Sequence, residues 1–210
     1  MTKTLIVTLL LGCCFVLPAS AADDSNDGAV LFKRECARCH GSEAQGGNGG
    51  EYPRLAGMSA GYIQQQLGSF RNRKRRNKPM LPIFKAGRLT DAAIEAVSRY
   101  LSELAPPTPE AIGIAELADA DLELGEEFYV TDCALCHGHD GSGKPGTDNP
   151  PLVSQHSRYI GKQMADFRNR KRWHEYGEAL FEEAETDELE AMVGYILHLN
   201  FHPPALPDTR

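Results

Sequence analysis

One five-residue pattern occurs twice in this chain, as Cys-Ala-Arg-Cys-His at residues 36–40 and as Cys-Ala-Leu-Cys-His at residues 133–137. The spacing has a chemical reason, because two thiols on one turn of helix can each form a thioether bond to the same haem. The histidine that follows then offers an imidazole nitrogen to the iron. The sequence therefore predicts two covalently bound haem c groups, attached through Cys36, Cys39, Cys133 and Cys136, with His40 and His137 as iron ligands.

The start of the chain predicts export. Lys3 precedes an apolar run over residues 5–16, and Ala19-Ser20-Ala21 forms a small-x-small cleavage site. We expect residues 1–21 to be a secretory signal and the mature protein to reside in the periplasm. Lipoprotein processing at Cys13 is an alternative, although it would cut the apolar run in its middle. No later stretch approaches the roughly 20 apolar residues of a membrane span, so we expect no transmembrane segment in the mature chain.

The cysteines and histidines favour haem over the other uses of a Cys-x-x-Cys pair, which include zinc knuckles and redox dithiols. Zinc would need a second pair of ligands nearby, and the first half of the chain has no histidine other than His40. A thioredoxin-like dithiol would lie in a βαβ pattern, which is absent. Of the six cysteines, Cys13 and Cys14 leave with the signal, so the remaining four are the two haem pairs.

Most of the mature chain is one module written twice at an offset of 97 residues, as Tyr62 and Tyr159 illustrate. Near the end of each module the offset falls to 95, because Tyr100 aligns with Tyr195. Such a match indicates gene duplication. Helical spacing dominates both modules, so we predict an all-α fold. The predicted boundaries are a signal at residues 1–21, a first domain at 22–105, a linker at 106–118 and a second domain at 119–210.

The sequence pattern of each module predicts three helical segments. The first runs into the haem motif, over residues 28–36 and again over 125–133. A middle helix begins near Ser59 or Ser157, and a closing helix follows an N-cap at Thr90 or at Thr186.

With these features the chain resembles tandem class I cytochrome c modules, and specifically the di-haem cytochrome c4 family. The resemblance covers essentially all of the mature chain. It implies two all-α domains related by a pseudo-twofold axis, with the haems close enough for fast electron exchange. It also implies that the carbonyl groups of Pro53 and Pro150 accept a hydrogen bond from Nδ1 of the haem histidines, which would orient those rings.

The family usually completes the iron with a methionine sulfur from a loop before the closing helix. In the first module Met80 lies ten residues before Thr90, so we expect it to be the second axial ligand. The other methionine, Met58, lies in the wrong segment.

The second module departs from this pattern, because Tyr176 stands ten residues before Thr186. Met164 and Met192 align with core positions, so the best replacement ligand is His174. A surface histidine, Tyr176 as ligand and a five-coordinate iron remain alternatives. We expect the other histidines to be solvent-facing: His139, His156, His198 and His202.

The formal net charge of -7 argues against a nucleic-acid partner. Two basic runs, at residues 71–78 and 168–172, recur in both modules. Because arginine binds carboxylates through a bidentate fork, we predict that these runs pair with haem propionates or shape the domain interface.

The leading functional hypothesis is a periplasmic electron carrier between redox partner proteins, with a membrane oxidase or reductase as one option. The rival is a small di-haem oxidoreductase, for example of sulfur compounds, or an electron-accepting subunit of one. Its only support is the missing methionine. Around that loop no acid-base residues are evident beyond His174, Glu175 and Tyr176, so we expect no catalytic residue.

Overall fold

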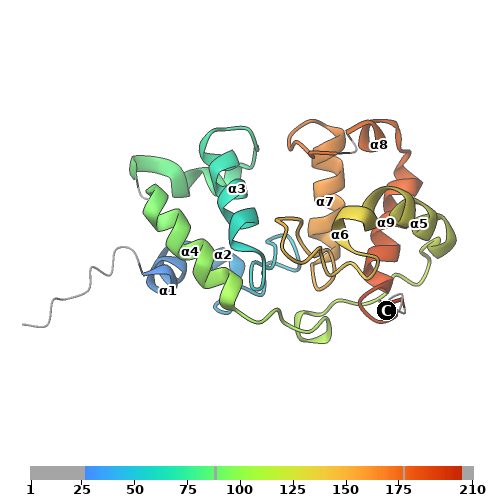
Figure 1. Ribbon diagram of the computed structural model, residues 1–210, viewed down its shortest axis with the longest axis horizontal. Coiled ribbons are helices and arrows are strands. Elements are labelled where there is room, and N and C mark those ends of the chain that lie inside the picture. The colour runs from blue at the N-terminus through green and yellow to red at the C-terminus, as the bar shows by residue number, and fades with distance from the viewer. Residues whose placement is uncertain (1–26, 88, 177, 205–210) are drawn as a thin grey trace, which may run out of the picture.

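The computed structural model describes residues 27–87, 89–176 and 178–204, so the expected signal at 1–21 lies outside the described residues. The described chain forms two helical domains that lie side by side, with the linker running along one edge of both (Figure 1). Within these ranges the only β feature is an isolated bridge between Gly47 and Tyr52, which confirms the all-α prediction. No described helix is both long and apolar enough to cross a membrane.

The first domain opens with a helix that leads directly into the haem motif. Asp27 caps α1 (Gly28–Leu31), and a π-helical turn (Phe32–Cys36) connects it to α2 (Ala37–His40). The remaining elements are α3 (Ala60–Arg71), a 3₁₀ helix (Lys78–Gly87) and α4 (Asp91–Glu103). Ser59 and Thr90 cap α3 and α4 through their side chains, which confirms the helix start near Ser59 and the predicted cap at Thr90.

The second domain repeats this order. Its elements are α5 (Leu122–Phe128), a π-helical turn (Tyr129–Cys133), α6 (Ala134–His137), α7 (Ser157–Arg168), α8 (Glu178–Glu183) and α9 (Thr186–His198). The predicted cap at Thr186 is wrong. The helix begins at Thr186 itself, and Glu185 is the N-cap in a reciprocal capping box with Glu188.

Each domain has a hydrophobic core of its own, built where the first helix crosses the closing helix. Gly28 and Gly125 allow this close crossing, because a Cβ at either position would clash with the backbone of the closing helix at Ala96 or Ala191. Met164 and Met192 are buried in the second core, which confirms their prediction as packing residues.

The linker is anchored to the second domain. It contains a short 3₁₀ turn (Glu110–Ile112), and Ile114 is buried in the second core. The chain therefore reaches the second domain several residues before α5 begins.

Candidate haem-binding site

One continuous cavity of about 1070 Å³ joins the two domains. Residues of both Cys-x-x-Cys-His motifs line it, together with side chains of α3 and α7, which lie next to each other at the centre of the molecule (Figure 1). The two motifs therefore open onto a shared interior space rather than onto separate faces of the protein.

The two motif histidines have matching environments. His40 Nδ1 donates a hydrogen bond to the carbonyl oxygen of Pro53 at 2.9 Å, and His137 Nδ1 donates to that of Pro150 at 2.9 Å. These contacts confirm the arrangement that the family resemblance implies. Burial lowers the pKa of both His40 and His137, although each proline carbonyl opposes the shift. Neutral imidazole, the form that binds a metal through nitrogen, is thereby favoured.

None of the four motif cysteines forms a disulfide among the described residues, so all four sulfur atoms are left for thioether bonds to haem. Burial raises the pKa of Cys36 and Cys133 to about 12, helped by the acidic neighbours Glu35 and Asp132.

Met80 lies within the 3₁₀ helix of the first domain, half-buried, and lines the cavity. Met58 also lines the cavity, but it is buried in the first core. In the sequence it lies between Pro53 and the start of α3. The structure thus brings the predicted ligand Met80 to the same space as His40 and adds Met58 as a second sulfur.

His174 lies opposite His137, with ring centroids 6.2 Å apart and planes inclined by 44°. Its ring packs edge-on against Phe167 at 4.9 Å and against Phe181 at 5.3 Å, and its Nδ1 contacts the carbonyl oxygen of Tyr176. His174 is half-buried, whereas the Tyr176 residue is 71 % exposed.

Two arginines cross the interface in a nearly symmetric pattern that follows the repeat. Arg75 donates to Tyr159 Oη at 2.8 Å and to Gln163 Oε1 at 2.6 Å in the other domain. Reciprocally, Arg172 donates to Tyr62 Oη at 2.9 Å. The sequence prediction that the basic runs shape the domain interface is confirmed for these two side chains.

One buried polar atom of this interface group, Gln163 Nε2, has no hydrogen-bond partner among the described residues. The Gln163 side chain also lines the cavity. Burial alone would raise the pKa of Tyr159, but the positive charges of Arg75 and Arg172 lower it. A cavity with buried arginines and a spare amide donor suits a ligand that carries carboxylates, as haem does through its propionates.

A second interdomain contact has no counterpart in the repeat, and the sequence analysis missed it. Arg54 is 1 % exposed and donates to the carbonyl oxygen of Ser154 at 2.6 Å, while its backbone N–H donates to Gln155 Oε1 at 3.0 Å. Ninety-seven residues later stands Pro151, which cannot make these bonds. The prediction that His156 is solvent-facing is also wrong, because it is half-buried and bonds to the carbonyl of Gln45 across the interface.

Comparison with known proteins shows the family to which the chain belongs. The cytochrome c family model matches residues 25–105 and again residues 122–200. A thiosulfate dehydrogenase electron acceptor from Stutzerimonas stutzeri (strain A1501) is 34 % identical over 195 residues, which is 87 % of this chain and 89 % of that protein. A cytochrome c4 from Thiocapsa roseopersicina is 32 % identical over 166 residues, or 73 % of this chain and 80 % of its own length.

A solved structure has the same arrangement of helices. Thiosulfate dehydrogenase from Marichromatium purpuratum matches with a TM-score of 0.68 and 27 % identity, over 81 % of this chain and 39 % of that one. The chain therefore belongs to the cytochrome c family. Within it, the chain is a di-haem member of the cytochrome c4 type, an electron carrier with two covalently bound haem c groups.

Proposed function

We propose that this protein is a periplasmic carrier that accepts electrons from a thiosulfate-oxidising dehydrogenase and passes them to a terminal oxidase or reductase. The observation that carries the proposal is the similarity over 87 % of the chain to a thiosulfate dehydrogenase electron acceptor. Residues 1–21 would direct export and be removed, and the mature domains would span residues 22–105 and 119–210.

The proposed attachment uses both halves of the repeat in the same way. Cys36 and Cys39 hold the first haem, and Cys133 and Cys136 hold the second. His40 and His137 would bind the irons, and since the proline carbonyls occupy their Nδ1 atoms, Nε2 is the nitrogen left for the metal. When bound, each haem gains or loses one electron at its iron.

We assign the remaining axial positions to Met80 in the first domain and His174 in the second. The half-buried position of Met80 on the cavity supports the first assignment. The second is supported by the 6.2 Å between the ring centroids of His137 and His174. This separation would leave room for one metal ion bound by a nitrogen of each imidazole, at metal–nitrogen distances of about 2 Å. Methionine raises haem potential relative to a second histidine, so with these ligands the first haem would have the higher potential.

The arginine pair has a proposed role toward the haem carboxylates. Arg75 and Arg172 line the cavity, and their hydrogen-bond partners in the described chain are tyrosine hydroxyls and glutamine oxygens. Propionates would supply the negative charge that two buried guanidinium groups require. Because each arginine bonds to the opposite domain, this contact would also fix the distance between the haems.

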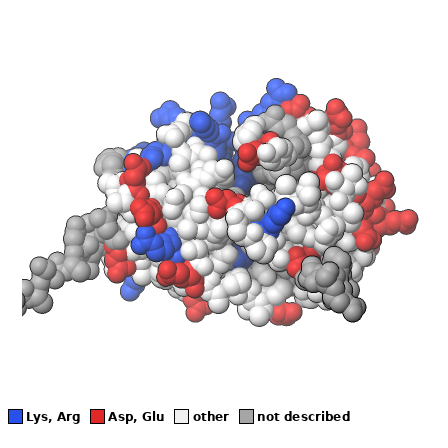
Figure 2. Space-filling model, viewed as in Figure 1, with Lys and Arg blue, Asp and Glu red and all other residues white. Residues whose placement is uncertain are grey.

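The formal charge of the two domains is opposite in sign, which favours different partners on the two sides. Residues 27–105 contain 13 Lys and Arg against 7 Asp and Glu, whereas residues 119–204 contain 7 against 17. In Figure 2 acidic side chains cover the outer side of the second domain, and basic ones gather at the top, over the ends of α3 and α7. Opposite charge on a carrier and its partner mainly sets the association rate and the choice of partner.

The test is reduction of the oxidised holoprotein by thiosulfate together with a thiosulfate dehydrogenase, followed through the haem absorption bands. We expect full reduction of both haems in the presence of the enzyme and no reduction by thiosulfate alone. Reduction without the enzyme would favour the rival oxidoreductase. Failure of the enzyme to reduce this protein, while it still reduces its own acceptor, would refute the proposed donor.

A further inference from the structure

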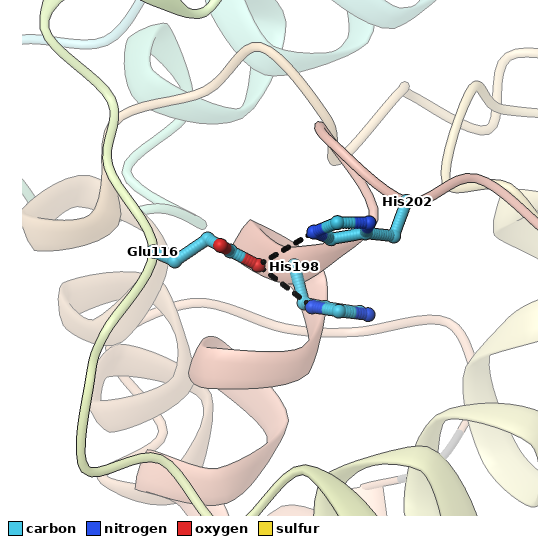
Figure 3. A group of neighbouring side chains, drawn as sticks. All are labelled: Glu116, His198 and His202. Atoms are coloured by element: carbon cyan, nitrogen blue, oxygen red, sulfur yellow. Dashed lines mark hydrogen bonds and ion pairs between the residues drawn. The ribbon is translucent and has the colours of Figure 1, made fainter.

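We propose that Glu116, His198 and His202 form a binding site for one divalent transition-metal ion, with Zn²⁺ as the expected occupant. Glu116 Oε1 lies 2.8 Å from His198 Nδ1 and 3.3 Å from His202 Nε2 (Figure 3). None of the three is among the described residues that line the haem cavity. The site is therefore separate from the haem chemistry and independent of the proposed electron donor.

The spacing of the donor atoms suits a small metal ion. The three ligand atoms all lie within 4.8 Å of one another. Tetrahedral zinc with bonds of about 2.0–2.2 Å places its ligand atoms roughly 3.3–3.6 Å apart. An ion could therefore enter the group with shifts of about 1 Å or less in side chains that are partly exposed to solvent.

The donor types point to the same class of metal. Two imidazole nitrogens and one carboxylate oxygen match the His₂Glu set of zinc sites that keep a fourth position for water. Imidazole also suits Cu²⁺ and Ni²⁺, whereas Mg²⁺ and Ca²⁺ prefer sites made of oxygen atoms alone. The group thus selects for borderline transition metals.

The two histidines are held in position by the end of the closing helix. The backbone N–H of His202 donates to the carbonyl of His198 at 3.0 Å, so one further helical turn follows α9. Residues four apart on such a turn lie on the same face, and the two rings stack with centroids 4.4 Å apart at 23°. The His198 ring also stacks against Tyr195, with ring centroids 6.2 Å apart.

The carboxylate comes from the linker and is equally well placed. Glu116 follows two residues after Ile114, which is buried in the second core. Figure 3 shows its side chain reaching from the linker toward both imidazoles. An ion pair would need only one of the histidines. The second imidazole, which converges on the same oxygen, supplies the third donor that a metal site needs.

A metal here would tie the end of the linker to the end of the chain. It would connect the segment before α5 to the last residue of α9 and the turn that follows it. Since binding is expected only in the folded state, saturating metal should stabilise the second domain.

The experiment uses the haem-loaded protein after removal of loose metals with a chelator, which leaves covalent haem in place. Zn²⁺ is titrated by calorimetry, and native mass spectrometry gives its stoichiometry. We expect one ion per chain, and at least a tenfold rise in Kd in His202→Gln and in Glu116→Gln. His139→Gln is the matched control, because His139 is exposed and lies outside the group, and it should leave Kd unchanged.

Two further measurements keep the result interpretable. Haem spectra and thermal unfolding without metal should be the same in wild type and variants, which would show that His202→Gln folds. With Cu²⁺ as probe, electron paramagnetic resonance should show coupling to two imidazole nitrogens in wild type and to one in His202→Gln. Equal Zn²⁺ affinity in wild type and both site variants, or an equal loss in His139→Gln, would overturn the proposal.

Discussion

The two domains share the side of the cavity that holds the motif histidine and differ on the opposite side. Phe70 and Phe84 of the first domain correspond to Phe167 and Phe181 of the second at the offset of 97 residues. The first pair of rings lies 6.4 Å apart, and the second pair lies 4.9 Å apart. Both domains therefore keep this pair of phenylalanine rings, and the two rings lie closer together in the second domain.

The difference arises in the segment between those aromatic residues. In the first domain it forms a 3₁₀ helix (Lys78–Gly87) that carries Met80. In the second it forms a short loop followed by α8, and His174 packs against both Phe167 and Phe181. His174 occupies the position of Asn77 in the repeat, three residues before Met80. Duplication thus preserved the two phenylalanines, while a change in one short segment places His174 beside them in the second domain.

The largest expected effect comes from removing the methionine. In Met80→Ala the potential of one haem should fall by on the order of 0.1 V, a modest part of the roughly 0.8 V range that axial ligands span. The charge-transfer band from methionine sulfur to ferric iron should disappear. Potentiometric titration and absorption spectra of the oxidised protein measure both.

Met58→Leu is the matched control for the methionine prediction, because Met58 also lines the cavity but is buried in the first core. It should keep the band and leave both potentials nearly unchanged. Survival of the band in Met80→Ala, or its loss in Met58→Leu, would show that the ligand is not Met80.

The second effect tests the other side of the comparison. In wild type we expect a six-coordinate, low-spin second haem that does not bind carbon monoxide or cyanide. His174→Ala should open this position, so that about one haem per chain binds added ligand. Tyr176→Phe should behave as wild type, since that side chain is largely exposed.

Spectra of the oxidised and reduced proteins show whether His174 binds the second haem iron. An unchanged ferric spectrum in His174→Ala would eliminate His174 as a ligand. Two methionine-ligated haems in wild type would remove the proposed asymmetry as a whole.

Local sequence patterns, together with the family resemblance, were sufficient to predict the helical domains and the environment of the motif histidines. The motifs, the repeat and the helical periodicity were enough to predict two all-α domains, and the resemblance to the cytochrome c4 family added that His40 and His137 lie beside proline carbonyls. The repeated basic run also indicated that arginines would lie at the interface, although the residues they contact were not foreseen. The repetition of Tyr62 as Tyr159 was the available signal for these partners.

Contacts that break the repeat could not be predicted in this way. Arg54 bonds to residues about 100 positions away, and nothing at Pro151 suggests such a contact. Glu116 and His198 are separated by 82 positions and meet close to the point where Ile114 is buried in the second core. Both contacts depend on how the second domain packs against the preceding chain, which has no periodic signature.

The smallest expected effect compares the starts of the two closing helices. Thr90 and Thr186 look equivalent in the sequence, but Thr90 Oγ1 accepts a hydrogen bond from Ala93 N–H at 3.1 Å, whereas Thr186 lies inside its helix. Thr90→Ala should therefore lower the free energy of unfolding by about 1 kcal/mol, and Thr186→Ala by only a few tenths. In the second domain Glu185→Ala should cost more than Thr186→Ala, because it removes the capping box. Thermal or denaturant unfolding of the haem-loaded variants measures the three values, and equal losses in Thr90→Ala and Thr186→Ala would contradict the shifted cap.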